Sequence, residues 1–120
     1  MSADPFKELK KLVKNFIQER DWQQYHTPKN LAMSISIESA EIMELFQWYT
    51  NKEALELIQS DPKTKLALED ELADVIIYCL SLSNTCDIDL ASVIRRKLQS
   101  NEKRSPIDVV SGRLGPYNTE

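Results

Sequence analysis

Apolar residues recur at every third or fourth position through most of this 120-residue chain, which is the spacing of one face of an α-helix. Three pairs of a capping residue followed by proline divide the pattern into segments: Asp4-Pro5, Thr27-Pro28 and Asp61-Pro62. Such a pair suits the start of a helix, because the cap side chain accepts a backbone hydrogen bond and proline fits the first turn. The pattern predicts long helices from Pro5 to about Arg20, Pro28 to about Tyr49, Pro62 to about Asn84 and Leu90 to about Asn101.

The breaks between these helices are short. The segment from Asp21 to Thr27 is aromatic and polar and predicts a connection, a short helix or turn is expected around residues 55–58, and residues 87–89 interrupt the pattern again. With only two glycines in the chain, we expect an all-α fold of four to five helices in one domain over residues 1–111. Residues 112–120 predict a tail that is mobile or packs on a partner subunit.

The second and third long helices, over residues 28–49 and 62–84, are apolar on nearly all sides apart from a few acidic residues. A helix of this kind is buried on more than one side. Because so small a chain offers little else to cover them, the sequence predicts a helical bundle that assembles into a homodimer or a dimer of dimers.

The charge pattern bears on partners and location. The net charge of −4 offers no general attraction to nucleic acids or anionic membranes, and the lysines between residues 7 and 14 alternate with apolar residues, as on an amphipathic helix. No stretch reaches the roughly 20 apolar residues of a membrane span, and no signal peptide is recognisable. We therefore expect a cytoplasmic protein that binds neither nucleic acid nor membrane, with Cys79 and Cys86 as reduced core residues.

Two acidic pairs interrupt the apolar helices: Glu38 with Glu41, and Glu71 with Asp74. Residues three apart share one face of a helix, and both pairs fall on or beside a stripe of large apolar residues. The stripe of the first pair also holds Leu31, Ile42, Leu45 and Trp48. Since the connection between the two helices is long enough for antiparallel packing, we expect the pairs to face each other.

Carboxylates inside an apolar bundle need a compensating cation, because an unpaired buried charge is very costly. Ligands that are all oxygen suit Mg²⁺, with Mn²⁺ as the other candidate. A di-iron centre has similar geometry but needs Glu-x-x-His on two helices, and the one histidine, His26, lies outside both pairs. Glu44 either extends the acidic cluster or ends it in solvent. The sequence thus predicts a magnesium site inside a helical bundle.

Four stretches of the chain form a recognisable set: R-D-W-Q-Q-Y-H-T-P-K-N-L (residues 20–31), E-S-A-E-I-M-E-L-F-Q-W (38–48), E-L-A-D-V-I-I-Y (71–78) and a run over residues 89–106 that ends in K-L-Q-S-N-E-K-R-S-P. With them, the segment from Trp22 to Pro106 resembles the MazG-like, all-α nucleoside triphosphate pyrophosphohydrolases, and among these the small dCTP pyrophosphatase type. The resemblance implies Mg²⁺-dependent hydrolysis of a (deoxy)nucleoside triphosphate between its α- and β-phosphates. The products are the monophosphate and pyrophosphate, and the implied purpose is removal of unwanted nucleotides.

The resemblance also implies roles for individual residues. Those that match the family's Mg²⁺ ligands are Glu38, Glu41, Glu71 and Asp74. Glu41, together with Glu38, is expected to act in catalysis by orienting or deprotonating the attacking water. Those that match phosphate-binding positions are Lys97, Asn101 and Arg104. Those that match positions near the base or the sugar are Trp22, Trp48, Tyr78, His26 and Asn30.

Two positions depart from the family's pattern. Val13 stands where the dCTP-type proteins carry a histidine, which removes a hydrogen bond to the base and bears on the choice of nucleotide. Ser105 replaces the tyrosine of the usual R-Y-P, so an aromatic contact near the phosphates or the subunit edge is lost. The alternative to an enzyme is a non-catalytic dimerisation or nucleotide-sensing module on the same scaffold. The loss of a metal ligand would favour that alternative, and all four ligands are present.

Overall fold

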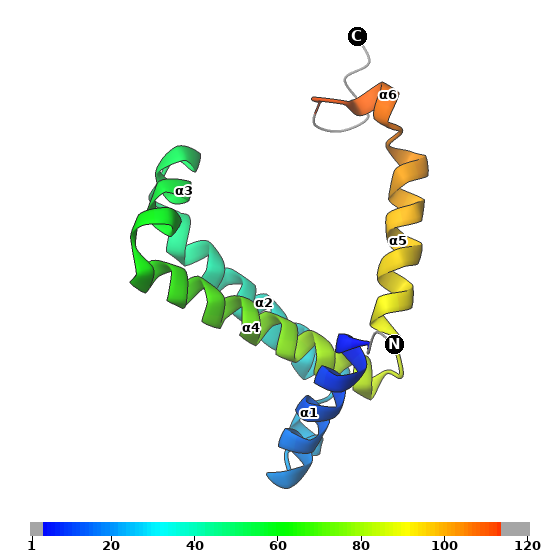
Figure 1. Cartoon of the computed structure of the whole chain (residues 1–120). Coiled ribbons are helices and arrows are strands. Elements are labelled where there is room, and N and C mark those ends of the chain that lie inside the picture. Colours follow the sequence, from blue (N-terminus) through cyan, green and yellow to red (C-terminus); the bar gives the residue numbers. More distant parts are fainter. Residues whose placement is uncertain (1–3, 114–120) are drawn as a thin grey trace. The chain divides into compact units, whose positions relative to one another are not determined.

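Helices make up almost all of the chain that the computed structural model describes, residues 4–113 (Figure 1). In chain order they are α1 (Pro5–Glu19), a 3₁₀ turn η1 (Gln23–Tyr25), α2 (Pro28–Phe46), α3 (Asn51–Ser60), α4 (Pro62–Thr85), α5 (Leu90–Arg104) and α6 (Ile107–Val110). No strand occurs within residues 4–113, so the expected all-α class is confirmed.

The helices begin where the cap residues predict. The side chains of Asp4, Thr27 and Asp61 each accept a hydrogen bond from a backbone N–H of the following turn, over N···O distances of 3.0, 3.3 and 3.1 Å. A reciprocal capping box opens α3: Thr50 Oγ1 accepts from the Glu53 N–H over 3.1 Å, and the Glu53 carboxylate accepts from the Thr50 N–H over 2.9 Å. These caps satisfy backbone donors that the helices themselves leave unpaired.

The helix ends agree less well with expectation. The second helix, α2, stops at Phe46 rather than near Tyr49, because the chain turns before Thr50 caps α3. Consequently the apolar stripe of α2 does not extend to Trp48, whose side chain is 84% exposed; placing Trp48 on that stripe was wrong. Beyond Ser105, where α5 is expected to have ended, the short helix α6 forms without a signal in the sequence pattern.

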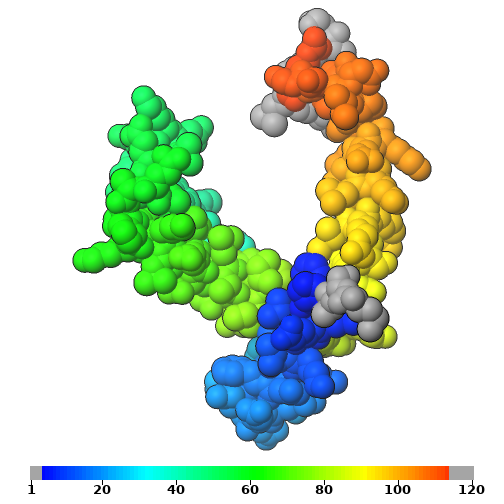
Figure 2. Space-filling view, viewed as in Figure 1, coloured from blue at the N-terminus to red at the C-terminus, as the bar shows by residue number. Residues whose placement is uncertain are grey.

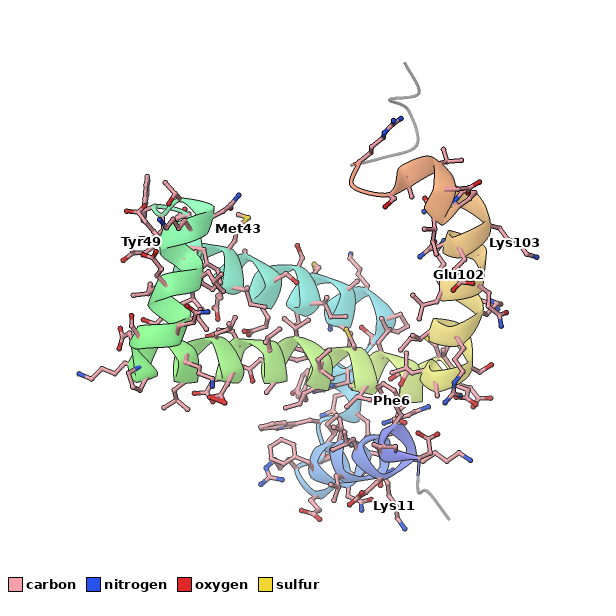
Figure 3. All side chains as sticks on the ribbon, turned by 45° about the horizontal axis from the view of Figure 1, so that its top comes forward. Phe6, Lys11, Met43, Tyr49, Glu102 and Lys103 are labelled. Atoms are coloured by element: carbon pink, nitrogen blue, oxygen red, sulfur yellow. The ribbon has the colours of Figure 1, made fainter. Side chains whose placement is uncertain are left out.

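An antiparallel pair of helices, α2 and α4, forms the centre of the first part of the chain (Figure 1). Both α1 and α3 also pack on α4. Near the end of α4, the Asn84 side-chain amide donates to the Lys10 carbonyl oxygen of α1 over 2.9 Å. Figure 3 shows side chains of α2 and α4 filling the space between their ribbons. This pairing brings the two acidic segments of the sequence side by side.

The apolar core is small for a chain with so many apolar residues. Within residues 4–113, the buried apolar side chains are Ile17, Leu31, Leu80 and Ala91. Large apolar side chains of α2 and α4 that remain exposed include Met33, Ile37, Leu66 and Ile76. On the face of α3 and α4 (green) that Figure 2 shows, no other part of residues 4–87 covers the surface except at the end that α1 reaches. In Figure 3, Met43 and Tyr49 project from the α2–α3 end.

The two cysteines lie in different environments near the end of α4. Both are free thiols; Cys79 is half-buried, and Cys86 is exposed at the C-terminal cap. The next residue, Asp87, adopts the left-handed conformation (φ 54°), which short polar side chains tolerate and which ends the helix. The expectation that both cysteines belong to the core is therefore wrong for Cys86.

The contacts divide the chain into two units, residues 1–87 and 88–120, of which residues 4–87 and 88–113 are described. The first unit holds α1 to α4 and the second holds α5 and α6. A single domain over residues 1–111 stays a prediction, and the expected tail lies outside the described residues from position 114 onward. No helix within residues 4–113 is long and apolar enough to cross a membrane.

The capping box makes a direct prediction about stability. Replacing Thr50 by alanine removes one of its two hydrogen bonds, and we expect the free energy of unfolding to fall by about 1 kcal/mol. Urea denaturation at fixed protein concentration measures this change. Thr50→Ser keeps the hydroxyl and serves as the control, so equal losses in both variants would contradict the role of the cap.

Candidate metal centre and adjoining pocket

Three carboxylates converge between α2 and α4. Glu38 comes from the middle of α2, and Glu71 and Asp74 lie one turn apart on α4. One oxygen of each lies within 4.8 Å of the others, a spacing at which one cation can contact all three. Glu38 and Glu71 are half-buried, whereas Asp74 is exposed. Antiparallel packing of the two helices thus brings three of the four predicted ligands into one group.

Glu41 lies next to this group without being part of it. Its carboxyl interacts with that of Glu71 on α4 and with that of Glu38, which lies one turn earlier on α2. The acidic pair on α2 therefore divides between two positions, with Glu38 inside the three-carboxylate group and Glu41 beside it. That Glu41 binds the metal stays a prediction.

Two carboxyl groups of this cluster, those of Glu38 and Glu71, have raised pKa values. The pKa of Glu71 is raised from 4.5 to about 7, first by side-chain hydrogen bonding with Glu41, then by burial, and then by the Glu38 carboxyl. Burial is the main cause that raises the pKa of Glu38, and repulsion from Glu41 and Asp74 adds to it. The shifts have a common origin, because desolvated like charges favour the protonated form.

Two oxygen atoms of this cluster are left without partners. Glu38 Oε2 and Glu71 Oε2 are buried and have no hydrogen-bond partner among the described residues. A buried carboxylate oxygen without a hydrogen-bond partner lowers the stability of the fold unless a cation approaches it. Since all the available ligand atoms are carboxylate oxygens, the residues present fit a hard divalent cation.

A cavity of about 480 Å³ adjoins the acidic cluster. Residues from α1 and α4 form most of its walls, including Leu9, Leu12, Val13, Phe16, Ile77 and Tyr78. Trp22 and His26, from the connection between α1 and α2, complete the walls, and Asp74 belongs both to this lining and to the acidic cluster. The cavity is therefore a largely apolar pocket with one end at the candidate metal centre.

Of the five residues expected near the base or sugar, the structure brings three to this pocket: Trp22, His26 and Tyr78. The Trp22 ring meets Phe16 edge-on, with 6.0 Å between ring centroids, and His26 stacks on Tyr78 with centroids 6.3 Å apart and a 28° angle between planes. The other two are elsewhere: Trp48 lies in the turn after α2, and the Asn30 side-chain amide donates to the Tyr25 carbonyl oxygen over 3.2 Å. Their contact with a substrate stays a prediction.

The apolar wall of the pocket could not be recognised from the sequence pattern. Leu9, Leu12 and Phe16 belong to the apolar face of α1, and such a face normally indicates core packing. In the structure they are 43%, 56% and 49% exposed. A second unrecognised residue is Ser81, whose hydroxyl lies 2.9 Å from His26 Nδ1 although 55 positions separate the two in sequence.

The predicted phosphate-binding residues share one side of α5 in the second unit. Lys97, Asn101 and Arg104 follow one another at intervals of four and three, which is the spacing of one helix face. The Arg104 guanidinium donates to Asn101 Oδ1 over 3.3 Å. The three side chains thus form a row of donors, and their contact with phosphate stays a prediction.

Comparison with known proteins identifies the scaffold. A model of the MazG-like family matches residues 33–113, which is more than half of the chain. The chain belongs to the MazG-like family. Its relatives include dCTP pyrophosphatase 1 of Bos taurus, 34% identical over 117 residues (97% of this chain and 69% of the relative). They also include dCTP pyrophosphatase 1 of Homo sapiens, 38% identical over 106 residues (88% of this chain and 62% of the relative).

A solved structure supports the same assignment. The crystal structure of a pyrophosphatase from Archaeoglobus fulgidus superimposes with a TM-score of 0.80 at 39% sequence identity, covering 88% of this chain and 96% of the other. The resemblance inferred from the sequence is therefore confirmed.

The MazG-like match has a boundary that is informative about the site. It begins at residue 33 in α2 and includes every carboxylate of the acidic cluster and the row of donors on α5. It leaves out α1, Trp22 and His26, which supply part of the pocket wall. The part of this MazG-like chain that carries the acidic residues is thus the part that defines the family.

The raised pKa of Glu71 predicts how stability depends on pH. A folded-state pKa of about 7 against a usual 4.5 means that the folded protein binds this proton more tightly than the unfolded chain. Without metal, we expect the free energy of unfolding to decrease as the pH rises from about 4.5 to about 7. Urea denaturation in chelator across this interval measures the decrease, and the raised pKa of Glu38 adds to it.

Glu71→Gln provides the control, because its amide cannot ionise and should flatten this slope. Divalent metal should have the largest stabilising effect above pH 7, where it no longer competes with the proton. If the free energy of unfolding of the metal-free wild type instead increases from about pH 4.5 to about pH 7, the placement of these carboxyls is contradicted.

Proposed function

We propose that this MazG-like chain is a Mg²⁺-dependent pyrophosphohydrolase that cleaves nucleoside triphosphates between the α- and β-phosphates. The observation that carries the proposal is the position of Asp74, which belongs both to the three-carboxylate group and to the lining of the apolar pocket. A nucleotide likewise joins a flat base, whose faces stack on aromatic rings, to a charged polyphosphate. The names of the relatives, dCTP pyrophosphatase 1 and a pyrophosphatase, support the same reaction class.

Glu38, Glu71 and Asp74 would hold the metal, with Glu41 as a fourth ligand or as their neighbour. When bound, Mg²⁺ supplies positive charge that offsets the charge of the triphosphate and polarises the phosphorus under attack. Mn²⁺ would fit the same oxygen ligands. The unpartnered oxygens of Glu38 and Glu71 support this occupancy, because no described protein group satisfies them.

In the proposed reaction, a water oxygen forms a bond to phosphorus while the bridging bond between the α- and β-phosphates breaks. Pyrophosphate leaves, and the water's proton passes to a carboxylate. Glu41, assisted by Glu38, is the proposed acceptor, because it lies beside the cluster while the other carboxylates form the coordination group. A carboxylate within reach of an attacking water is a common general base.

The base is proposed to occupy the 480 Å³ pocket between Trp22 and the stacked pair of His26 and Tyr78. Aromatic faces bind bases by stacking. Val13 adds an aliphatic side chain to the wall where the dCTP-type relatives are expected to have a histidine. We propose substrates related to dCTP, including modified pyrimidines, so that the enzyme would remove unwanted nucleotides from the cytoplasmic pool.

Lys97, Asn101 and Arg104 are proposed to bind the phosphates. Their spacing on α5 gives a row of donors, and a guanidinium or an ammonium forms strong, charge-assisted hydrogen bonds with phosphate oxygens. Support comes from the match to the MazG-like family, which extends through the whole of α5. Trp48 and Asn30 are retained as proposed contacts to the base or sugar on the resemblance alone.

We further propose that the protein is a homodimer or a dimer of dimers. Exposed apolar side chains on α2 and α4, such as Met33 and Leu66, support this, because a soluble monomer rarely leaves so much apolar surface open. The test is sedimentation velocity at micromolar concentration. We expect a dimer or tetramer for the wild type, and a shift toward monomer when Met33 is replaced by glutamate.

A matched control for that experiment is Gln99→Glu, which adds the same charge at an exposed position of α5. It should leave the sedimentation coefficient unchanged. A wild type that sediments as a monomer would rule out the assembly.

The enzymatic proposal is tested with a panel of nucleoside triphosphates and Mg²⁺, separating monophosphate, diphosphate, pyrophosphate and phosphate. We expect monophosphate and pyrophosphate from the wild type, and no turnover in chelator. Asp74→Asn and Glu38→Gln should each reduce turnover by roughly 100-fold or more, because they remove metal ligands. They should also abolish the increase in melting temperature that Mg²⁺ produces in the wild type.

Glu69→Gln is the control for this set, because Glu69 is exposed on the same helix and lies outside the acidic group. It should retain wild-type turnover. Nucleotide binding without hydrolysis of any triphosphate would support the sensing module instead of the enzyme.

A further inference from the structure

Ser81 holds a buried hydroxyl against the single histidine of the chain. It lies on α4, one turn after Tyr78, and is 3% exposed. Its Oγ is 2.9 Å from His26 Nδ1. This hydrogen bond connects α4 with the segment that precedes α2, and both of these elements contribute residues to the pocket wall.

The direction of the Ser81–His26 hydrogen bond follows from what else is within reach. Other hydroxyls near the end of α4 donate to backbone carbonyls: Ser83 to Leu80 over 2.7 Å, and Thr85 to Ser81 over 3.0 Å. Among the described residues, the Ser81 hydroxyl has one hydrogen-bond partner, the His26 ring. A buried O–H needs an acceptor, so Ser81 donates and Nδ1 accepts.

This direction determines the form of the imidazole. A nitrogen that accepts a hydrogen bond carries no proton, so the ring is neutral with its proton on Nε2. Burial of the ring, which lowers the pKa of His26, agrees with a neutral imidazole. Stacking on Tyr78 and a hydrogen bond from Thr85 Oγ1 to the His26 carbonyl oxygen, over 3.2 Å, hold the residue in place.

His26 borders two cavities, and the hydrogen bond indicates which of them Nε2 faces. The smaller cavity, of about 230 Å³, is lined by Ser81 and His26, whereas the larger pocket of about 480 Å³ is lined by His26 but not by Ser81. The two ring nitrogens point in roughly opposite directions. With Nδ1 toward Ser81, we infer that Nε2–H faces the larger pocket, and no described residue forms a hydrogen bond with it there.

We propose that Ser81 is a positioning residue that fixes His26 as a hydrogen-bond donor to a carbonyl oxygen of the base. The proposal rests on the function proposed above, which places a base in this pocket. A donor there favours bases with a carbonyl beside the glycosidic bond, which every common pyrimidine has as O2. The common purines have no carbonyl at that position; ring nitrogen N3, a weaker acceptor, stands there instead. Ser81 and His26 would thus select pyrimidines as a class, without distinguishing cytosine from uracil at this contact.

The tautomer can be observed without any substrate. Because the chain has one histidine, ¹⁵N-resolved NMR of the untagged protein reports His26 alone. We expect a neutral ring protonated at Nε2 in the wild type, and a mixture of tautomers in Ser81→Ala. Ser83→Ala is the matched control, because it removes an equally buried hydroxyl from the same helix that bonds to the backbone instead. A wild-type ring protonated at Nδ1 would overturn the proposal.

Steady-state kinetics test the consequence for binding. We expect Ser81→Ala to raise KM for the best pyrimidine triphosphate by roughly five- to tenfold, as the loss of one hydrogen bond does, with a much smaller change in kcat. Ser81→Thr keeps the hydroxyl and should restore most of the affinity. Ser83→Ala should leave KM unchanged. Equal KM values for the Ser81→Ala and Ser83→Ala variants would contradict the proposed contact.

A substrate analogue identifies the atom involved. In a 2-thiopyrimidine triphosphate, sulfur replaces O2 and accepts hydrogen bonds poorly. The wild type should prefer the oxygen compound, and Ser81→Ala should lose most of that preference; an unchanged preference would count against O2 as the acceptor. If the wild type hydrolyses no triphosphate, the enzymatic proposal fails, whereas the NMR result still decides the tautomer.

Discussion

Mutual repulsion among desolvated carboxylates is the constraint on which the rest of this structure depends. Glu38, Glu41, Glu71 and Asp74 are brought together because α2 and α4 pack against each other in opposite directions. That packing removes water from groups that water would otherwise stabilise, and the raised pKa values of Glu38 and Glu71 are the result. A helical pair built only for stability would place apolar residues there. A bound cation would offset this repulsion, and the free energy of metal binding would then add to the stability of the fold.

Much of the fold could be predicted from the sequence because its signals are local. A cap residue and the proline that directly follows it determine where a helix begins, so Asp4, Thr27 and Asp61 marked the starts of α1, α2 and α4 correctly. The acidic pairs were equally visible, since a spacing of three depends only on helix geometry. Helix ends were less certain: the stripe of α2 appeared to continue to Trp48, but the capping box at Thr50 requires the chain to turn first.

The pocket could not be predicted in the same way. Its wall combines the apolar face of α1 with the middle of α4, and nothing in a single helix distinguishes an apolar face that packs from one that borders a cavity. The contact between His26 and Ser81 joins residues 55 positions apart. A serine within an apolar helix gives no sign of its partner. Family resemblance supplied Trp22, His26 and Tyr78 as candidates, and the structure added the residues that hold them.

The division of labour between helices has a consequence for how such a protein can diverge. The carboxylates lie on α2 and α4, within the part of the chain that matches the MazG-like family, whereas α1 lies before that match and contributes Leu9, Leu12, Val13 and Phe16 to the pocket. Substitutions in α1 can therefore reshape the pocket while every carboxylate keeps its neighbours. If the proposed function holds, changes confined to this one amphipathic helix could alter which base is preferred, while the residues proposed for the phosphate chemistry stay the same.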